Sequence, residues 1–405
     1  MKFSELNLDP KLLEGIEAIG FENTTPVQEA TIPKILEGKD LIAAAQTGTG
    51  KTAAFLLPII HKILTEAKDD GHIKALVIVP TRELAVQIDQ QLEGLSYYTS
   101  VSSLAVYGGG DGQSFDREKK ALSEGADIII GTPGRLIAHL NMNYVKVSQL
   151  DYLILDEADR MLDMGFNEDI TKIIGYLPKE RQTLLFSATM PTKIRQLAKN
   201  ILKDPEEISI AISKPNEKIV QAAFIVYDGQ KIELVKHILK PDWLRSVIVF
   251  CSTKDNTKRL TKELKKANLS VEEIHSDLEQ KSREQVLNQF KSRKLKILVA
   301  TDILSRGIDV EDIDIVINYD VPNDGEDYIH RIGRTARAAS TGAAFTFVNE
   351  KEQSKFQSIE QLLGKPVPKA KIPPHIGEGP SYSPKPYRGG GGRGGGGRKG
   401  GGKKR

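Results

Sequence analysis

The chain has 405 residues, a formal net charge of +3 and a single cysteine, Cys251. This length predicts about two or three domains, and one cysteine excludes both an intramolecular disulfide and a cysteine-cluster metal site. No apolar run approaches the length of a membrane span, about eighteen residues. The opening segment, MKFSELNLDPKLLEG, contains no apolar signal core, so we expect a cytoplasmic protein.

The positive charge is concentrated at the C-terminal end. From Lys365 onward there are eleven lysines and arginines and one acid, Glu378, a net charge of +10 that leaves −7 for residues 1–364. A basic, flexible tail favours a polyanionic partner, although a tail that only improves solubility remains an alternative.

Short apolar runs alternate with stretches of helical periodicity along most of the chain. Runs of this length, rich in Val and Ile, are typical of strands buried on both faces of a parallel sheet. The predicted strands lie, in chain order, at 40–45, 75–79, 103–107, 127–131, 152–155, 183–186, 246–251, 296–300, 314–319 and 343–348. Strands that alternate with helices predict an α/β fold.

The alternation is interrupted around 202–218, LKDPEEISIAISKPNEK, where prolines and charges accumulate. We therefore predict two α/β domains joined by a linker. Eleven of the last eighteen residues are glycine, a composition that cannot bury a core and predicts disorder. The predicted organisation is an N-terminal domain over 1–206, a linker over 207–218, a C-terminal domain over 219–366 and a disordered basic tail over 367–405.

The first predicted strand leads into a phosphate-binding pattern, AQTGTGKTAAF. Gly48, Gly50, Lys51 and Thr52 match the end of a P-loop, whose backbone N–H groups surround phosphates at a helix N-terminus. Lys51 would contact the β and γ phosphates, and Thr52 would hold Mg²⁺. The general pattern has glycine where this chain has Ala45, but the strand–turn–helix context is the expected one.

A second motif, YLILDEADRMLD, ends a predicted strand at Asp156, at the sheet edge where ligands bind in such folds. Asp156 could hold Mg²⁺ through its water shell. Glu157 could orient or deprotonate a water that attacks the γ-phosphate. The alternative is that both acids only cap the following helix.

Residues 156–159 spell DEAD, and the chain from residue 3 to about 350 strongly resembles the DEAD-box family of ATP-dependent RNA helicases. The resemblance implies two tandem RecA-like domains with parallel sheets, and ATP and Mg²⁺ as cofactors. It implies that the P-loop segment binds the nucleotide through Ala45, Gln46, Thr47, Gly48, Thr49, Gly50, Lys51 and Thr52.

The segment GFENTTPVQ, residues 20–28, resembles the adenine-contacting Q motif of this family. By that resemblance Phe21 stacks on the base, Gln28 hydrogen-bonds its edge, and the backbone near Asn23 also contacts it. Phe3 resembles the isolated upstream aromatic residue. Thr24 stands where the family usually has proline, which predicts a less rigid loop.

Three further motifs of the first domain, PTRELA, YGGG and TPGR, resemble the family's RNA-backbone contacts, and each follows a predicted strand. Cations, N–H groups and hydroxyls suit phosphate and 2′-OH contacts rather than base recognition. The implied RNA-binding residues are Pro80, Thr81, Arg82, Gly109, Thr132, Pro133, Gly134 and Arg135. The SAT motif resembles the one that couples hydrolysis to strand separation, with Ser187 and Thr189 hydrogen-bonded to the Asp159 carboxylate.

The second domain contains IVFCST, QKSR and ATDILSRGIDV, which resemble the family's motif IV, its QxxR motif and its motif V. The implied RNA contacts are Gln280, Arg283, Thr301 and Arg306. Gly307 and Asp309 are expected at the nucleotide's phosphate and ribose.

The segment YIHRIGRTARA carries Arg331, Arg334 and Arg337 at a spacing of three, which on a helix would place them on roughly one face. Such a cluster needs an anion opposite. HRIGRTAR resembles motif VI, in which Arg334 and Arg337 act as arginine fingers on the γ-phosphate held by the other domain, and His330 links nucleotide contacts to RNA contacts. A surface salt bridge is an equal alternative for Arg331.

Together these motifs predict an RNA-stimulated ATPase that closes its two domains around ATP and RNA, and the resemblance implies that it separates short duplexes locally. An ATP-gated RNA clamp is the first alternative, and a DNA helicase and a small-molecule kinase are weaker ones. We expect a monomeric core, backbone-read single-stranded or short duplex RNA, no membrane, and partners from ribosome assembly or RNA decay. The tail would tether RNA, and its Tyr382 and Tyr387 are candidates for base stacking.

Overall fold

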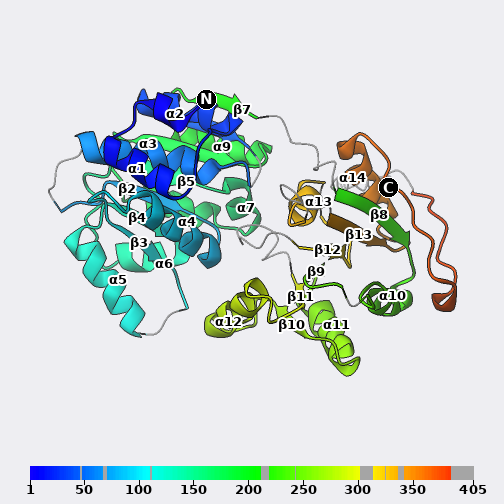
Figure 1. Ribbon diagram of the computed structural model, residues 1–405. Coiled ribbons are helices and arrows are strands. Elements are labelled where there is room, and N and C mark those ends of the chain that lie inside the picture. The colour runs from blue at the N-terminus through cyan, green and yellow to red at the C-terminus, as the bar shows by residue number, and fades with distance from the viewer. Residues whose placement is uncertain are drawn as a thin grey trace, which may run out of the picture.

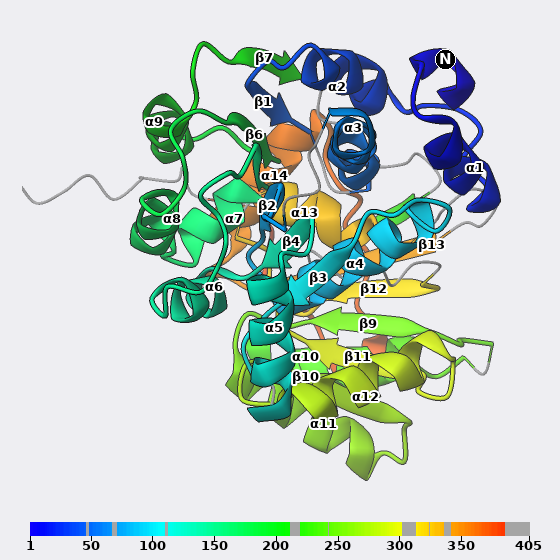
Figure 2. The same cartoon turned by 90° about the vertical axis from the view of Figure 1, so that its left-hand side faces the viewer.

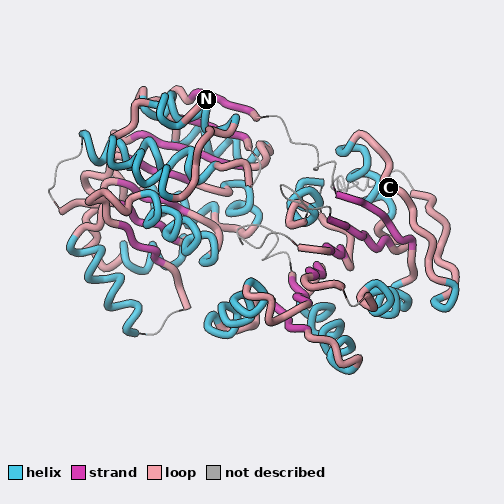
Figure 3. Tube along the Cα trace, viewed as in Figure 1, coloured by secondary structure: helices cyan, strands magenta, loops and turns pink. Residues whose placement is uncertain are grey.

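The computed structural model describes residues 1–45, 48–66, 71–109, 112–210, 219–241, 243–301, 313–323, 325–335 and 342–384. Within them the chain forms two parallel sheets, each enclosed by helices (Figures 1 and 3). This confirms the predicted α/β fold with two parallel-sheet domains. None of the helices in these ranges combines the length and the apolar character needed to cross a membrane.

The first sheet has seven strands in the order β3-β4-β2-β5-β6-β1-β7, and all neighbours are parallel. The strands are β1 (Leu41–Ala44), β2 (Ala75–Ile78), β3 (Ser103–Val106), β4 (Ile128–Gly131), β5 (Tyr152–Leu155), β6 (Gln182–Ser187) and β7 (Glu206–Ser209). The helices of this domain are η1 (Phe3–Leu6), α1 (Pro10–Ala18), α2 (Pro26–Leu36), α3 (Lys51–Glu66), α4 (Arg82–Leu95), α5 (Gly112–Glu124), α6 (Pro133–Leu140), α7 (Ala158–Asp163), α8 (Asn167–Ile174) and α9 (Thr192–Ile201).

Alternate residues of each central strand belong to different cores, because successive side chains point to opposite faces of a sheet. Leu41 and Ala43 of β1 pack with α1 to α4, whereas Ile42 between them packs with α5, α6, α8 and α9. Both faces are apolar, which is why these strands appear in the sequence as continuous rather than alternating apolar runs.

The second sheet has six strands in the order β10-β11-β9-β12-β13-β8, again all parallel. Its strands are β8 (Ile219–Ile225), β9 (Val247–Phe250), β10 (Val271–Ile274), β11 (Ile297–Ala300), β12 (Ile315–Asn318) and β13 (Gly342–Val348). Its helices are η2 (Asp228–Gln230), α10 (Lys231–Ile238), α11 (Lys254–Lys266), α12 (Gln280–Lys291), α13 (Gly325–Ile332), α14 (Gln353–Leu363) and η4 (Pro374–Ile376). Figure 2, viewed from the side of the first domain, shows α11 and α12 extending beyond it.

The predicted start of the linker at residue 207 is wrong. β7 continues to Ser209 and pairs in parallel with β1, so these residues complete the edge of the first sheet. Two other strands, β8 and β10, were not among the predicted runs. Residues 211–218, the rest of the predicted linker, lie outside the described residues.

Residues 367–384 are also structured, although the sequence predicts a disordered tail from residue 367. We call this segment the strap. Its backbone bonds to the edge strand β8: Ala223 N–H donates to Pro368 O and Ala370 N–H donates to Ala223 O, both at 2.8 Å. Val367 is buried in the core formed by α13, α14 and β8. Residues 385–405, with the glycine-rich run and Tyr387, lie outside the described residues.

Candidate active site

The phosphate-binding pattern lies where β1 ends and α3 begins, as its sequence predicts. Gly48 and Gly50 have φ values of 78° and 90°, in the left-handed region that favours glycine. A Cβ at Gly50 would lie 2.5 Å from Gln28 Nε2, so the turn and the Q motif are in close contact. Lys51 and Thr52 open α3. The first N–H groups of a helix have no partner within the helix and favour an anion.

Lys51 and Asp156 face each other inside the first domain. Lys51 Nζ lies 4.0 Å from Asp156 Oδ1, and both side chains are about 95% buried. Among the described residues Lys51 Nζ has no hydrogen-bond acceptor. Burial raises the pKa of Asp156 to about 6, against the opposing effect of Lys51. Burying an ammonium without an acceptor, or an ionised carboxylate, is energetically unfavourable. A bound anion beside Lys51 and a bound cation beside Asp156 would offset both penalties.

Glu157 adopts the left-handed conformation, with φ 50° and ψ 49°, at the start of α7. Its backbone N–H donates to Asp156 Oδ1 at 2.9 Å, and its own Oε2 lies 3.6 Å from Arg160 Nη1. A non-glycine residue in this conformation is uncommon and stores strain of about 1–3 kcal/mol, a feature that clusters at functional sites. The turn directs two adjacent carboxylates to the same sheet edge.

Asp159 binds the SAT motif, but not entirely as expected. Thr189 donates to Asp159 Oδ2 through its N–H at 3.0 Å and through its hydroxyl at 3.1 Å. The expected bond from Ser187 to this carboxylate is wrong: the Ser187 hydroxyl accepts from the Asp159 N–H at 3.3 Å and donates to Thr189 O at 2.7 Å. Ser187 therefore orients Thr189, which in turn binds Asp159.

The Q-motif residues gather beside the phosphate-binding turn. Phe21 stacks on Phe3 with ring centroids 6.0 Å apart. Gln28 Nε2 donates to Gly50 O at 3.0 Å, and Gln28 Oε1 accepts from Thr25 N at 2.8 Å. This buried amide therefore connects the Q motif to the P-loop turn.

The loop that carries Asn23 has two ties that were not predicted. The exposed Asn23 forms an antiparallel bridge with Lys2. Thr24, in place of proline, donates to Met1 O through its N–H at 2.9 Å and to Glu29 Oε1 through its hydroxyl at 2.7 Å. These hydrogen bonds restrain the loop around Thr24, which the sequence predicts to be less rigid.

Two of the first domain's expected nucleic-acid contacts meet directly. Arg82, the first residue of α4, lies against Gly109, where a Cβ would be 2.1 Å from Arg82 Nη1. Thr81 caps α4 by accepting from Leu84 N at 3.3 Å, and Pro80 precedes it at the end of β2. Gly109 has φ 91° and is exposed, so its N–H lies at an open surface beside a guanidinium.

Arg135 belongs to a network that its motif does not predict. Its Nε donates to Glu118 Oε2 at 2.6 Å, and its guanidinium lies 4.6 Å from the Phe115 ring centroid. Glu118 Oε2 also lies 2.7 Å from His139 Nε2. The three residues before Arg135 begin α6: Thr132 is the N-cap and Pro133 is the first residue of the helix. Gly134 is exposed, and a side chain added there would meet no atom within 4 Å.

The second domain reaches the first through Arg283. Arg283 Nη1 donates to Glu83 Oε1 at 2.8 Å, and both side chains are 10% exposed. Arg283 was expected to contact RNA, and Glu83 was not singled out although it follows Arg82 in PTRELA. Thr301, at the end of β11, is buried, and its hydroxyl has no hydrogen-bond partner among the described residues.

Arg331 and Arg334 of the motif VI segment do not lie on one helix. α13 ends at Ile332, so Arg331 is helical and Arg334 lies in the following turn, where its carbonyl accepts from Ile313 N at 3.3 Å. A surface salt bridge for Arg331 is wrong: it is fully buried and donates to Asn318 Oδ1 at 3.2 Å and Asp320 O at 3.3 Å. His330 is also buried.

Several expected site residues lie outside the described residues: Gln46, Thr47, Arg306, Gly307, Asp309 and Arg337. Gln280 begins α12, but only its backbone is described.

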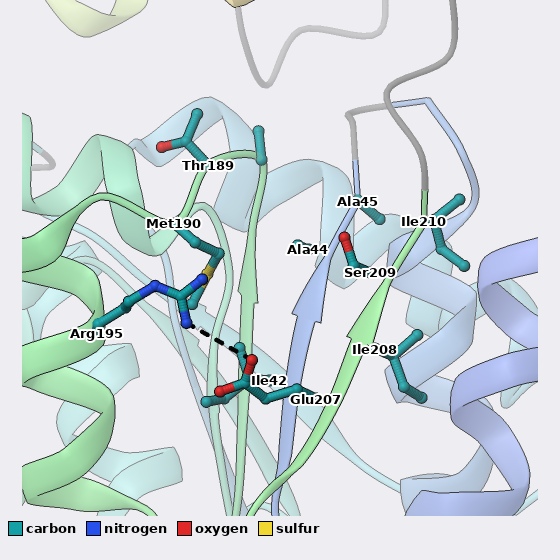
Figure 4. Close-up of a pocket in the computed structure, with 11 residues that line it drawn as sticks. Ile42, Ala44, Ala45, Thr189, Met190, Arg195, Glu207, Ile208, Ser209 and Ile210 are labelled. Atoms are coloured by element: carbon teal, nitrogen blue, oxygen red, sulfur yellow. Dashed lines mark ion pairs between the residues drawn. The ribbon is translucent and has the colours of Figure 1, made fainter.

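A pocket of about 240 Å³ lies beside the phosphate-binding strand (Figure 4). Ala44 and Ala45 line it from the end of β1, and Thr189 lines it from the segment after β6. Arg195 and Glu207 form an ion pair 3.6 Å long across its edge. Its lining is largely apolar, and the cation that lines it, Arg195, is paired with Glu207, so the pocket does not resemble a phosphate site.

The chain matches two family models, DEAD/DEAH box helicase over residues 25–197 and the helicase conserved C-terminal domain over residues 230–339. It is 44% identical over 365 residues to the ATP-dependent RNA helicase CshA of Listeria monocytogenes, covering 90% of this chain and 69% of that protein.

Solved structures give the same result. Dbp5 of S. cerevisiae bound to RNA and ADP BeF3 superposes with a TM-score of 0.81 at 30% identity, covering 91% of this chain and 95% of that one. Mss116p bound to ssRNA and AMP-PNP superposes with a TM-score of 0.82 at 32% identity, covering 92% and 80%. The chain therefore belongs to the DEAD-box family of ATP-dependent RNA helicases.

Proposed function

We propose that this chain hydrolyses ATP at the cleft between its two domains, is stimulated by RNA, and uses the cycle to separate short RNA duplexes locally and non-processively. The observation that carries the proposal is the buried Lys51 ammonium, 4.0 Å from the buried Asp156 carboxylate at the carboxyl edge of the first sheet. Family membership and the RNA-bound relatives support the choice of RNA.

The nucleotide would lie along the P-loop turn. Gln28, which already bonds to Gly50, would contact the adenine edge, because an amide offers both a donor and an acceptor. Phe21 would stack on the base. Lys51 would bind the β and γ phosphates, in keeping with its lack of an acceptor among the described side chains.

The donor set near Lys51 suits a magnesium ion. Thr52 and Asp156 would hold it, and Mg²⁺ would neutralise the charge that develops on the phosphate oxygens. Glu157 would orient the attacking water and accept its proton, since it lies at the same strand end. Arg334 and Arg337 would contact the γ-phosphate from the second domain.

RNA would bind across both domains through its backbone. Arg82, Arg135 and the N–H of Gly109 offer phosphate contacts in the first domain, and Arg283 and Thr301 offer them in the second. A ligand that contacts both domains favours their closed arrangement, and so does ATP, so each should strengthen the binding of the other. Loss of phosphate would reopen the cleft and release RNA.

The test is steady-state ATP hydrolysis with and without single-stranded RNA, with DNA of the same sequence beside it. We expect stimulation by RNA only, followed by ATP-dependent displacement of a short RNA strand. Equal rates with and without RNA, or stimulation by DNA alone, would overturn the proposal. RNA stimulation without strand displacement would favour an ATP-gated clamp instead.

A further inference from the structure

Three guanidinium groups from three separate motifs, Arg82, Arg135 and Arg283, influence one another electrostatically, and one of them, Arg283, joins the two domains. Burial lowers the pKa of Arg82, and the nearby charges of Arg283 and Arg135 lower it further. Arg283 of the second domain donates a hydrogen bond to Glu83, the residue that follows Arg82 in the chain. Like charges repel each other, so the arrangement of these arginines depends on the acids that accompany them.

Arg283 and Arg135 each have a carboxylate partner. Arg283 has Glu83 at 2.8 Å, and Arg135 has Glu118 at 2.6 Å. Glu118 belongs to α5, outside every motif that we identified, and its side chain is only 8% exposed. A carboxylate buried at that depth requires partners that justify its desolvation.

Glu118 is itself fixed from behind. One of its oxygens, Oε2, accepts from Arg135 Nε and lies 2.7 Å from Nε2 of the buried His139. The other nitrogen of that ring, Nδ1, contacts the Tyr144 hydroxyl. His139 also stacks on Phe115 at 4.4 Å, and Arg135 lies over the same Phe115 ring at 4.6 Å.

These contacts determine which nitrogens of the Arg135 guanidinium already have a partner. Nε is taken by Glu118, whereas Nη2 is buried and has no acceptor among the described residues. A guanidinium held at Nε over an aromatic ring presents its two terminal nitrogens in a fixed plane, the geometry that binds a phosphate through two parallel hydrogen bonds.

We propose that Glu118 is a positioning residue for RNA-backbone binding, which holds Arg135 in the plane that a phosphate requires; this rests on the proposed function. Glu118 does not contact RNA itself. It acts through Arg135, because its Oε2 accepts from Arg135 Nε and holds the guanidinium over the Phe115 ring. The alternative is a purely structural role, in which Glu118 only packs α5 against α6.

A double-mutant cycle distinguishes the positioning role of Glu118 from a purely structural role. RNA affinity is measured by fluorescence anisotropy with a single-stranded RNA. Arg135→Ala should weaken RNA binding by about tenfold, the range of one charged hydrogen bond. Glu118→Ala should weaken it by about fivefold in the wild-type background and by less than about twofold in the Arg135→Ala background, because its effect passes through Arg135.

Two further variants separate positioning from folding. Glu118→Gln keeps an oxygen acceptor for Arg135 Nε and should recover most of the RNA affinity. Glu124→Gln is the matched control, since it removes a carboxylate from the same helix at an exposed position, where it pairs with Lys120; it should bind RNA like the wild type. The half-saturating ATP concentration without RNA should stay within about twofold in Glu118→Ala, Glu118→Gln and Glu124→Gln.

Equal losses from Glu118→Ala with and without Arg135, or a shift in ATP half-saturation as large as the shift for RNA, would overturn the positioning role alone. Wild-type protein that fails to bind RNA would overturn the proposed function, and this inference with it.

Discussion

Arg283 of α12 donates to Glu83 of α4 at 2.8 Å, a contact that joins the two domains between residues 200 positions apart. Both side chains are 10% exposed, so this is a largely desolvated pair rather than a surface one. Glu83 follows Arg82, and Arg283 belongs to the QxxR segment. One ion pair therefore connects the two segments, one in each domain, that were expected to contact nucleic acid.

A charge reversal at either end of this pair should impair RNA-stimulated hydrolysis. Glu83→Arg or Arg283→Glu leaves two like charges facing each other in a buried place, so we expect kcat over the half-saturating RNA concentration to fall by about tenfold or more. The double reversal restores opposite charges and should recover part of the loss.

The control for this prediction is Glu272→Arg, which reverses one end of the exposed Lys265–Glu272 pair within the second domain. It should change the rate by less than about twofold, because exposed pairs contribute at most about 1 kcal/mol. A double reversal no more active than the worse single variant would contradict a direct role for the pair.

Asp156→Asn should stabilise the protein without ligands while it abolishes ATP hydrolysis. Burial raises the pKa of this carboxyl to about 6, whereas an unfolded aspartate titrates at about 3.9. Ionising it in the folded protein is therefore unfavourable at pH 7.5. The amide should raise the free energy of unfolding by about 1–3 kcal/mol in a urea titration without Mg²⁺.

The sign of the pH dependence provides the check. Because the folded carboxyl binds its proton more tightly than the unfolded one, wild-type stability from this group falls as pH rises from about 4 to about 6 and then stays level. The advantage of the asparagine variant should therefore shrink when the titration is repeated at pH 5. A variant less stable than the wild type at pH 7.5 would mean that the Lys51 pair outweighs the burial.

Gly50→Ala should weaken ATP binding more than its backbone strain explains. The new Cβ would lie 2.5 Å from Gln28 Nε2, so the amide must move and lose its bond to Gly50 O. Gly38→Ala is the matched control, because Gly38 has a similar φ of 78° with open space around it. Each should lose about 1 kcal/mol of stability, but only Gly50→Ala should raise the half-saturating ATP concentration. Equal ATP binding by the two variants would contradict the contact between the Q motif and the P-loop.

The strap should be part of the second domain's fold. A chain that ends after Pro384 keeps the bonds to Ala223, the buried Val367 and the hydrogen bond from the Tyr382 hydroxyl to Glu360 at 2.6 Å. A chain that ends after Pro366 loses all of them, so we expect its second domain to be less stable by about 3 kcal/mol or more in thermal unfolding. Identical unfolding of the two chains would show that the strap only lies on the surface.

Sequence alone predicts the central strands well because both of their faces are buried. It misses β7 and β10 for the opposite reason: these are edge strands, and their sequences, EEIS and VEEI, place glutamates on exposed or half-exposed positions. Composition also misleads over the strap, where prolines indicate disorder but spaced apolar residues and backbone bonds to β8 fix the chain. Tyr382, proposed for base stacking, instead packs on Phe356.

The phosphate-binding turn and the DEAD strand are local patterns, so their geometry follows from sequence. Partners brought together by the fold do not. The spacing of the arginines gives no sign that α13 ends at Ile332, which buries Arg331 against Asn318 and leaves Arg334 in the turn. Glu118 carries no local signal, and only the packing of α5 on α6 places it against Arg135.

The central claim is that one site is completed by both domains, and Arg334 tests it most directly. We would measure RNA affinity with and without a non-hydrolysable ATP analogue, in the wild type, in Arg334→Ala and in Arg245→Ala, an exposed arginine of the same domain. The account predicts that the analogue tightens RNA binding by about tenfold or more in the wild type and in Arg245→Ala, but not in Arg334→Ala. RNA affinity that ignores the analogue in the wild type, or full tightening in Arg334→Ala, would contradict it.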